Sequence, residues 1–167
     1  YDPQHPSPSF APPQNGKAAE IGDYAPISQR SDVLTYTTEP LPQSMTIAGQ
    51  ISMELYAATD AVDTDFACRV LDVAPDGVSR ALNAGLLRGK WRKGLFQYEP
   101  ITPGKAELYN IEIGNAAWQI HAGHRLAIQV CSALFPLCDR NLNTGEPSSS
   151  CNHALSTNQT IFHDALH

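Results

Sequence analysis

The sequence predicts an all-β domain with about seven or eight short strands, arranged as a sandwich or a jelly roll. Three observations lead to this prediction: short stretches alternate apolar and polar residues, turn sequences separate them, and no segment has a convincing helical periodicity. The 13 prolines and 11 glycines also indicate many turns and few long helices.

The N-terminal residues 1–31 are rich in proline and show no periodicity, so they are expected to form an extended arm. Phe10 and Ile27 are among the apolar residues that could anchor it. From Val33 onward the pattern becomes that of strands. The predicted organisation is an arm over 1–31 followed by a β-sandwich over 32–167.

The strongest strand prediction covers 47–57, where apolar and polar positions alternate without a break. The same alternation recurs over 66–70, 109–113 and 126–130, which are expected to form further strands. Residues 82–87 have mixed periodicity and are expected to form a strand or a brief helical turn. The turn signals between these segments are Pro75-Asp76-Gly77, Pro103-Gly104 and His121-Ala122-Gly123.

Length and composition indicate a globular domain and exclude several classes of partner. A chain of 167 residues with 42% hydrophobic residues can bury a substantial core. The net charge of −6 argues against a nucleic-acid partner, because phosphate binding needs clustered Lys and Arg. No apolar run approaches the roughly 18 residues of a membrane span, so no membrane partner is expected. Because residue 1 is Tyr, the chain is expected to be a fragment or a processed product.

A polar stretch over 139–145 follows one of the alternating apolar segments. Its Asp, Asn and Thr side chains can bond to nearby backbone and its Gly accepts positive φ, so a tightly hydrogen-bonded turn is expected. Cys138 and Cys151 flank this turn, and a disulfide between them would be worth about 3 kcal/mol. Whether this pair is oxidised stays open; oxidation would favour an extracellular or periplasmic location. Cys68 and Cys131 lie within predicted strands and are expected to be buried thiols.

Two groups of residues have the chemistry of metal ligands, but neither forms a complete ligand set. They are the histidine pairs His121/His124 and His163/His167 and the carboxylates Asp60, Asp63 and Asp65. No third ligand accompanies either histidine pair, so exposed or locally bonded histidines are expected. The carboxylates could bind calcium, but a solvated strand start, or ion pairs with an arginine such as Arg69 or Arg125, is favoured. No metal or cofactor is therefore expected.

The sequence offers no nucleophile and only a weak case for a ligand platform. A serine hydrolase usually carries its nucleophile in a Gly-x-Ser-x-Gly turn, and Ser132 has no glycine on either side. No catalytic residue is therefore predicted in this chain. The aromatic residues Trp91, Phe96, Tyr98 and Trp118 could form a carbohydrate-stacking platform, although aromatic residues scattered over strands more often belong to a core.

Eight short motifs occur in an order that matches a known family. They are the stretches 32–41 (DVLTYTTEPL), 63–66 (DTDF), 71–77 (LDVAPDG), Leu87-Arg88, Pro103-Gly104, Gly123-His124-Arg125, Phe135-Pro136 and the 139–145 turn. With them, nearly the whole chain resembles the C-terminal domain of the X-prolyl dipeptidyl-peptidase, cocaine esterase and α-amino-acid ester hydrolase family. The resemblance implies a jelly-roll β-sandwich of the galactose-binding-like type. It also implies a preceding α/β-hydrolase domain that holds the Ser-Asp-His triad and forms the partner of this domain.

The chain departs from the family pattern in two places. The family usually continues after the segment that corresponds to 163–167 with Pro-Ser and a final apolar strand, so one strand is expected to be absent here. The region between Cys138 and Cys151 also differs from the commoner pattern.

The resemblance implies roles for two parts of the chain. In the family, the segment before the Asp-Val-Leu motif runs along the hydrolase domain toward the substrate cleft, so Phe10 is expected near that cleft. The polar turn is expected to brace the domain or its interface, with Arg140 and Arg125 organising the polar contacts. The expected structural or interface cluster is Asp63, Asp65, Arg125, Asp139, Arg140 and Asn141. Two alternatives to an accessory domain of a serine hydrolase remain, a carbohydrate-binding module and a structural or homo-oligomerisation domain.

Overall fold

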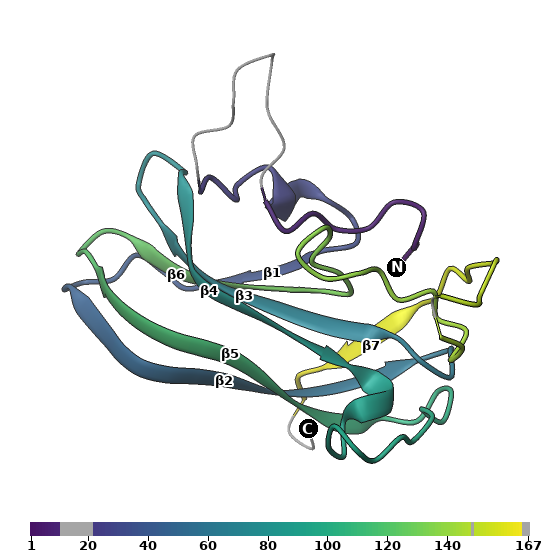
Figure 1. Ribbon diagram of the computed structural model, residues 1–167. Coiled ribbons are helices and arrows are strands. Elements are labelled where there is room, and N and C mark those ends of the chain that lie inside the picture. Colours follow the sequence, from purple (N-terminus) through teal and green to yellow (C-terminus); the bar gives the residue numbers. More distant parts are fainter. Residues whose placement is uncertain (11–21, 148, 165–167) are drawn as a thin grey trace.

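The computed structural model describes residues 1–10, 22–147 and 149–164, which form two antiparallel β-sheets packed against each other (Figure 1). Within these residues, helical structure is limited to two single 3-10 turns, η1 (Ile27–Gln29) and η2 (Gly89–Trp91). The all-β class predicted from the sequence is confirmed, and the two sheets make the domain a β-sandwich. None of the described helices is long or apolar enough to cross a membrane.

Seven strands form the two sheets of the described chain, and every neighbouring pair is antiparallel. The four-stranded sheet has the order β1 (Leu34–Thr37), β6 (Arg125–Cys131), β3 (Asp65–Val73) and β4 (Ser79–Arg88). The three-stranded sheet has the order β5 (Glu107–Ile120), β2 (Met45–Thr59) and β7 (Gln159–Phe162). The alternating segments predicted from the sequence lie inside β2, β3, β5 and β6, and the ambiguous segment 82–87 is part of β4.

Strand β3 forms the centre of the core because both of its faces are covered. Phe66 packs with Tyr109 of the opposite sheet, with ring centroids 4.4 Å apart, and Cys68 packs against Ile113. On the other face, Ala67 belongs to a second cluster with Ile27 of η1. The period-two pattern predicted only one buried face for this strand. The second face is buried because residues 22–33 return over the four-stranded sheet, which the proline-rich sequence did not indicate.

Gly85 of β4 sets the close approach of the two sheets. A Cβ atom added at Gly85 would lie 2.0 Å from the backbone oxygen of Glu112 in β5. Backbone atoms cannot withdraw from such a contact without separating the strands, so only glycine fits at this position. The mixed periodicity of 82–87 follows from this packing, because β4 contacts β5 as well as its sheet neighbour β3.

The first ten residues lie along the chain that follows β6 (Figure 1). Pro8 forms a parallel bridge with Phe135, and the backbone N–H of Ser9 donates to the Phe135 carbonyl at 2.7 Å. Elsewhere in this segment the chain turns, because the backbone N–H of His5 donates to the Asp2 carbonyl at 3.0 Å. Residues 22–31, by contrast, carry η1, whose Ile27 is fully buried, and this part of the predicted arm contributes to the core.

Candidate functional site

Three connections, two of them long, leave the sandwich at the same end, which we call the loop end. They are residues 60–64, 89–106 and 132–158. The strand register requires this arrangement, because Asp65 pairs with Arg88, Ala67 pairs with Cys131, and Thr59 pairs with Gln159. Residues 89–106 and 132–158 are longer than most connections in a compact domain, and such long connections are often functional. The loop end is therefore the part of the fold most suited to contact another surface.

A buried ion pair holds the polar turn against the strands at the loop end. Asp65 begins β3 and is 1% exposed, and its two carboxylate oxygens accept bonds from Nε and Nη2 of Arg88 at 3.0 and 3.1 Å. Arg88 also donates to the carboxylate of Asp139 at 3.1 Å. Asn141 donates from its side-chain amide to Asp65 at 2.8 Å. Two adjacent strand ends and the turn therefore share one network.

The electrostatics of this network suit a structural role. Burial raises the pKa of the Asp65 carboxyl, against the opposing effect of the bonds from Arg88 and Asn141. For Arg88, burial disfavours the charge, but the bonds to Asp65 and Asp139 prevail and raise its pKa. The guanidinium therefore stays charged and supplies the positive charge that the buried carboxylate requires. Arg88 belongs to the Leu87-Arg88 motif of the family resemblance, but the sequence did not indicate that it joins this polar cluster.

The expected polar cluster is only partly assembled. Asp65, Asp139 and Asn141 meet at Arg88, and Arg140 is close by, donating to the Pro3 carbonyl at 3.0 Å. Asp63 is buried but pairs separately with Lys90, whose Nζ lies 3.1 Å from its carboxylate. Arg125 lies at the opposite end of the sheet and donates to the Thr38 carbonyl. Arg125 therefore does not organise this cluster.

Arg69 is a second buried arginine, and it fixes the N-terminal segment. It lies fully buried in β3, with Nη1 donating to Gln129 at 3.2 Å and Nη2 donating to the Pro8 carbonyl. Its guanidinium also lies 5.7 Å from the centre of the Tyr24 ring. From the sequence, Arg69 was expected only as a possible ion-pair partner of nearby carboxylates. An arginine between apolar residues in the middle of a strand is the signal that could have identified it.

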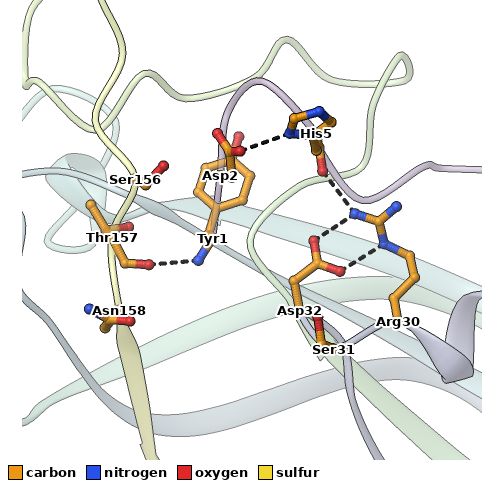
Figure 2. Close-up of a pocket in the computed structure, with 9 residues that line it drawn as sticks. All are labelled: Tyr1, Asp2, His5, Arg30, Ser31, Asp32, Ser156, Thr157 and Asn158. Atoms are coloured by element: carbon orange, nitrogen blue, oxygen red, sulfur yellow. Dashed lines mark hydrogen bonds and ion pairs between the residues drawn. The ribbon is translucent and has the colours of Figure 1, made fainter.

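The segment 1–5 borders an open pocket of about 630 Å³ at this end of the molecule (Figure 2). The backbone nitrogen of Tyr1 donates to the Thr157 carbonyl at 2.6 Å. Arg30 forms a two-pronged ion pair with Asp32, and both bonds measure 2.7 Å. The charged side chains that line the pocket are thus already paired with each other, which indicates a structural junction between the arm, residues 30–32 and the strand β7.

The candidate ligand groups from the sequence are distributed over both ends of the sandwich. Trp91 and Tyr98 pack edge to face at the loop end, whereas Trp118 lies near the far end of β5 and donates to Asp72 at 3.0 Å. Phe96 is fully exposed. These aromatic residues therefore do not form a single platform.

The histidines and aspartates have separate local partners. His124 bonds to Asp72 at 2.7 Å, and its ring lies beside that of His121. His163 packs against Tyr36, while His167 lies outside the described residues. Asp60 accepts bonds from Asn158, so Asp60, Asp63 and Asp65 have three different partners. Ser132 is buried directly after β6.

All four cysteines are free thiols, and the disulfide considered between Cys138 and Cys151 is not formed. Cys138 packs beside the cluster of Ile27 and Leu134, and burial raises the pKa of its thiol. The thiol of Cys151 has other neighbours, because its Sγ lies 3.6 Å from Nδ1 of His153. Cys68 and Cys131 are buried, as expected.

Large apolar side chains are exposed at the loop end and on the arm. Leu95 is 78% exposed, and its neighbour Phe96 is fully exposed. Phe10, at the end of the described arm, is 61% exposed, and Phe135 and Leu137 are also exposed. Adjacent exposed apolar side chains such as Leu95 and Phe96 are typical of surfaces that bind another protein.

Comparison with known proteins identifies the family. A family model described as the X-Pro dipeptidyl-peptidase C-terminal non-catalytic domain matches residues 2–167. The chain belongs to this family. The chain is also similar to the cocaine esterase of Rhodococcus sp. (strain MB1 Bresler). The two sequences are 40% identical over 153 residues, which cover 87% of this chain and 26% of that protein.

Two solved structures share the fold of this family domain over nearly its whole length. An aminopeptidase from a marine sediment archaeon, Thaumarchaeota archaeon, superposes with a TM-score of 0.86 and 30% identity, covering 99% of this chain and 30% of that one. An α-amino acid ester hydrolase superposes with a TM-score of 0.85 and 28% identity, covering 96% and 29%. The chain therefore spans about a quarter to a third of these relatives.

Proposed function

We propose that this chain is the accessory domain of a serine hydrolase that cleaves ester or X-prolyl peptide bonds, and that its loop end braces the catalytic domain. Membership of a non-catalytic domain family supports the accessory role. The names of the similar proteins, an esterase, an ester hydrolase and an aminopeptidase, support the class of reaction. The catalytic domain would be the partner that covers the loop end.

The exposed pair Leu95 and Phe96 carries this proposal. The connection that holds them is fixed at its base, because Arg92 donates to the carbonyl of Glu99 at 2.7 Å and pairs with Glu107. A fixed loop that presents two large apolar side chains to water is suited to dock on a partner. Burying each of them would contribute about 1.5–3 kcal/mol to docking.

The polar network at Asp65 and Arg88 supports the same role. It ties the turn 139–141 to β3 and β4, so that three connections keep their relative positions without a partner. A surface that is already ordered loses little conformational entropy on docking. We extend the proposal to Phe10, which would border the substrate cleft; its side chain is exposed, and Arg69 and Phe135 hold the chain two residues before it, at Pro8.

Activity measurements test the accessory role. The isolated chain is expected to hydrolyse neither a p-nitrophenyl ester nor an X-Pro anilide. Turnover that disappears on a substitution within this chain would refute the proposal. The separation of Trp118 from Trp91 and Tyr98 weakens the carbohydrate-binding alternative, and calorimetric titration with a panel of sugars is expected to show no heat of binding.

The docking role is tested in the full-length protein with the variant L95S/F96S. Loss of the apolar contact is expected to separate the thermal unfolding of this domain from that of the catalytic domain. The matched control is Tyr36→Ser, which removes an exposed aromatic side chain from the edge strand β1, where it pairs with Ile128 in the middle of β6. Equal effects of the two variants would contradict docking through the loop end.

A further inference from the structure

The long connection between β6 and β7 brings three potential metal ligands together. Glu146, Cys151 and His153 place a carboxylate oxygen, Sγ and a ring nitrogen within 4.8 Å of one another. We propose that these residues bind a zinc ion. The set is independent of the proposed docking function, because it does not include Leu95 or Phe96.

The hydrogen bonds of the connection explain how residues five and seven positions beyond Glu146 come back to it. The backbone N–H groups of Ser150 and Cys151 both donate to the Pro147 carbonyl at 3.1 Å, which turns the chain back on itself. The N–H of Glu146 donates to Thr144 Oγ1 at 3.3 Å. The carboxylate of Glu146 and the thiol of Cys151 therefore lie side by side on the two arms of one turn.

The base of the connection is fixed to the rest of the domain. Leu155 donates its N–H to the Leu142 carbonyl at 3.0 Å, and the side chain of Asn143 donates to the Leu155 carbonyl at 2.6 Å. Asn143 is fully buried and has a φ of 62°, a conformation that Asn tolerates better than most residues. The ligand-bearing turn thus stands on an ordered base, so binding an ion requires only local adjustment.

The distance between the sulfur and nitrogen ligands fits a tetrahedral ion. Zinc bonds of about 2.3 Å to sulfur and 2.0 Å to nitrogen place those two donor atoms about 3.5 Å apart when the ligands are tetrahedral. Sγ of Cys151 and Nδ1 of His153 are 3.6 Å apart. One thiolate, one imidazole and one carboxylate form a ligand set of the kind that zinc favours, with a water molecule as the fourth ligand.

Binding of the zinc ion releases one proton, from the thiol of Cys151. The thiol of Cys151, which donates to the His153 carbonyl at 3.1 Å, would release its proton to solvent and bind as the thiolate. Thr144 Oγ1 lies 3.4 Å from the sulfur and could then donate its hydroxyl proton to the thiolate. The sequence alone did not indicate this site, because Cys151 was considered only as a disulfide partner of Cys138.

Titration of the reduced, intact protein with Co²⁺ tests the proposal. We expect a thiolate-to-cobalt charge-transfer band and strong tetrahedral visible bands that saturate at one equivalent and are displaced by Zn²⁺. Cys151→Ser is expected to abolish the charge-transfer band. Glu146→Gln and His153→Gln should each weaken binding about tenfold or more, since even partners of the ligands typically contribute 10–100-fold.

Two matched variants control for binding elsewhere. Cys138→Ser removes the other partly exposed thiol, and His121→Gln removes a histidine from the opposite end of the sandwich; both are expected to keep the cobalt spectrum. As a second measurement, Zn²⁺ should slow maleimide labelling of Cys151. The proposal is overturned if no charge-transfer band forms, if it survives Cys151→Ser, or if Cys138→Ser removes it.

Discussion

Replacing Arg88 with leucine tests the polar network of the loop end most sharply. The substitution leaves the carboxylate of Asp65 almost fully buried, with the Asn141 amide as its remaining side-chain hydrogen-bond donor. Removing one partner of a buried ion pair typically costs about 3–5 kcal/mol. The second contact, to the exposed Asp139, adds no more than about 1 kcal/mol. The expected loss in free energy of unfolding is therefore about 3–5 kcal/mol.

Urea denaturation of the 167-residue chain, followed by circular dichroism, measures this loss. For a domain of this size the corresponding fall in melting temperature is about 2–4 °C for each kcal/mol. The double variant D65N/R88L removes both charges and is expected to recover much of the lost stability, because no unpaired buried charge remains. Arg80→Leu, at an exposed position of the same strand, is the control and should change stability by less than about 0.5 kcal/mol.

The pH dependence of Arg88→Leu follows from the buried carboxylate. Burial raises the pKa of the Asp65 carboxyl, and the Arg88 guanidinium lowers it. In Arg88→Leu the lowering effect is lost, so the pKa of Asp65 should rise further. A group whose pKa is higher in the folded state stabilises the fold below its unfolded pKa, and this contribution is lost as pH rises through the folded pKa. The deficit of R88L should therefore shrink as the pH is lowered. A cost below about 1 kcal/mol, or a double variant no more stable than R88L, would refute the reasoning.

Three further predictions concern the core. Gly85→Ala should destabilise the domain by about 1–3 kcal/mol or more in urea denaturation, because its Cβ would collide with the Glu112 backbone; unchanged stability would show that β4 and β5 can separate freely. Arg69→Met should increase proteolytic cleavage within the first ten residues, because the Pro8 carbonyl loses its donor; cleavage at the wild-type rate would contradict that anchoring role. Burial raises the pKa of Cys68 to about 12 from the ordinary 9.0, so the stability that this thiol contributes should fall as pH rises from about 9 toward 12, and Cys68→Ala should reduce that slope.

The fold could be predicted because its strands alternate in hydrophobicity. The pattern located 47–57 within β2 and gave the interior positions of β5 and β6, and the order of short motifs indicated the family. The pattern could not predict that β3 is buried on both faces, since this depends on the return of residues 22–33 over the sheet. It also left 82–87 ambiguous, because Gly85 interrupts the alternation where β4 approaches the backbone of the opposite sheet.

The site was less predictable because its contacts join residues that are far apart in the sequence. Asp65, Asp139 and Asn141 were expected in one cluster, but the arginine that links them is Arg88 rather than Arg125. The decisive facts are strand register and the ends at which loops emerge, and neither is encoded in the local spacing of charged residues. For the same reason, the neighbours of Cys151 depend on a turn whose path the sequence does not specify.

Site-specific photo-crosslinking tests the central claim, that the loop end docks on the catalytic domain of the same protein. A photoreactive phenylalanine analogue would replace Phe96 in the full-length protein, and the same analogue at Gln119, an exposed position at the far end of β5, would serve as the control. The account predicts an efficient crosslink from position 96 to the catalytic domain and little from position 119. Absence of a crosslink at position 96, or equal crosslinking at both positions, would contradict it.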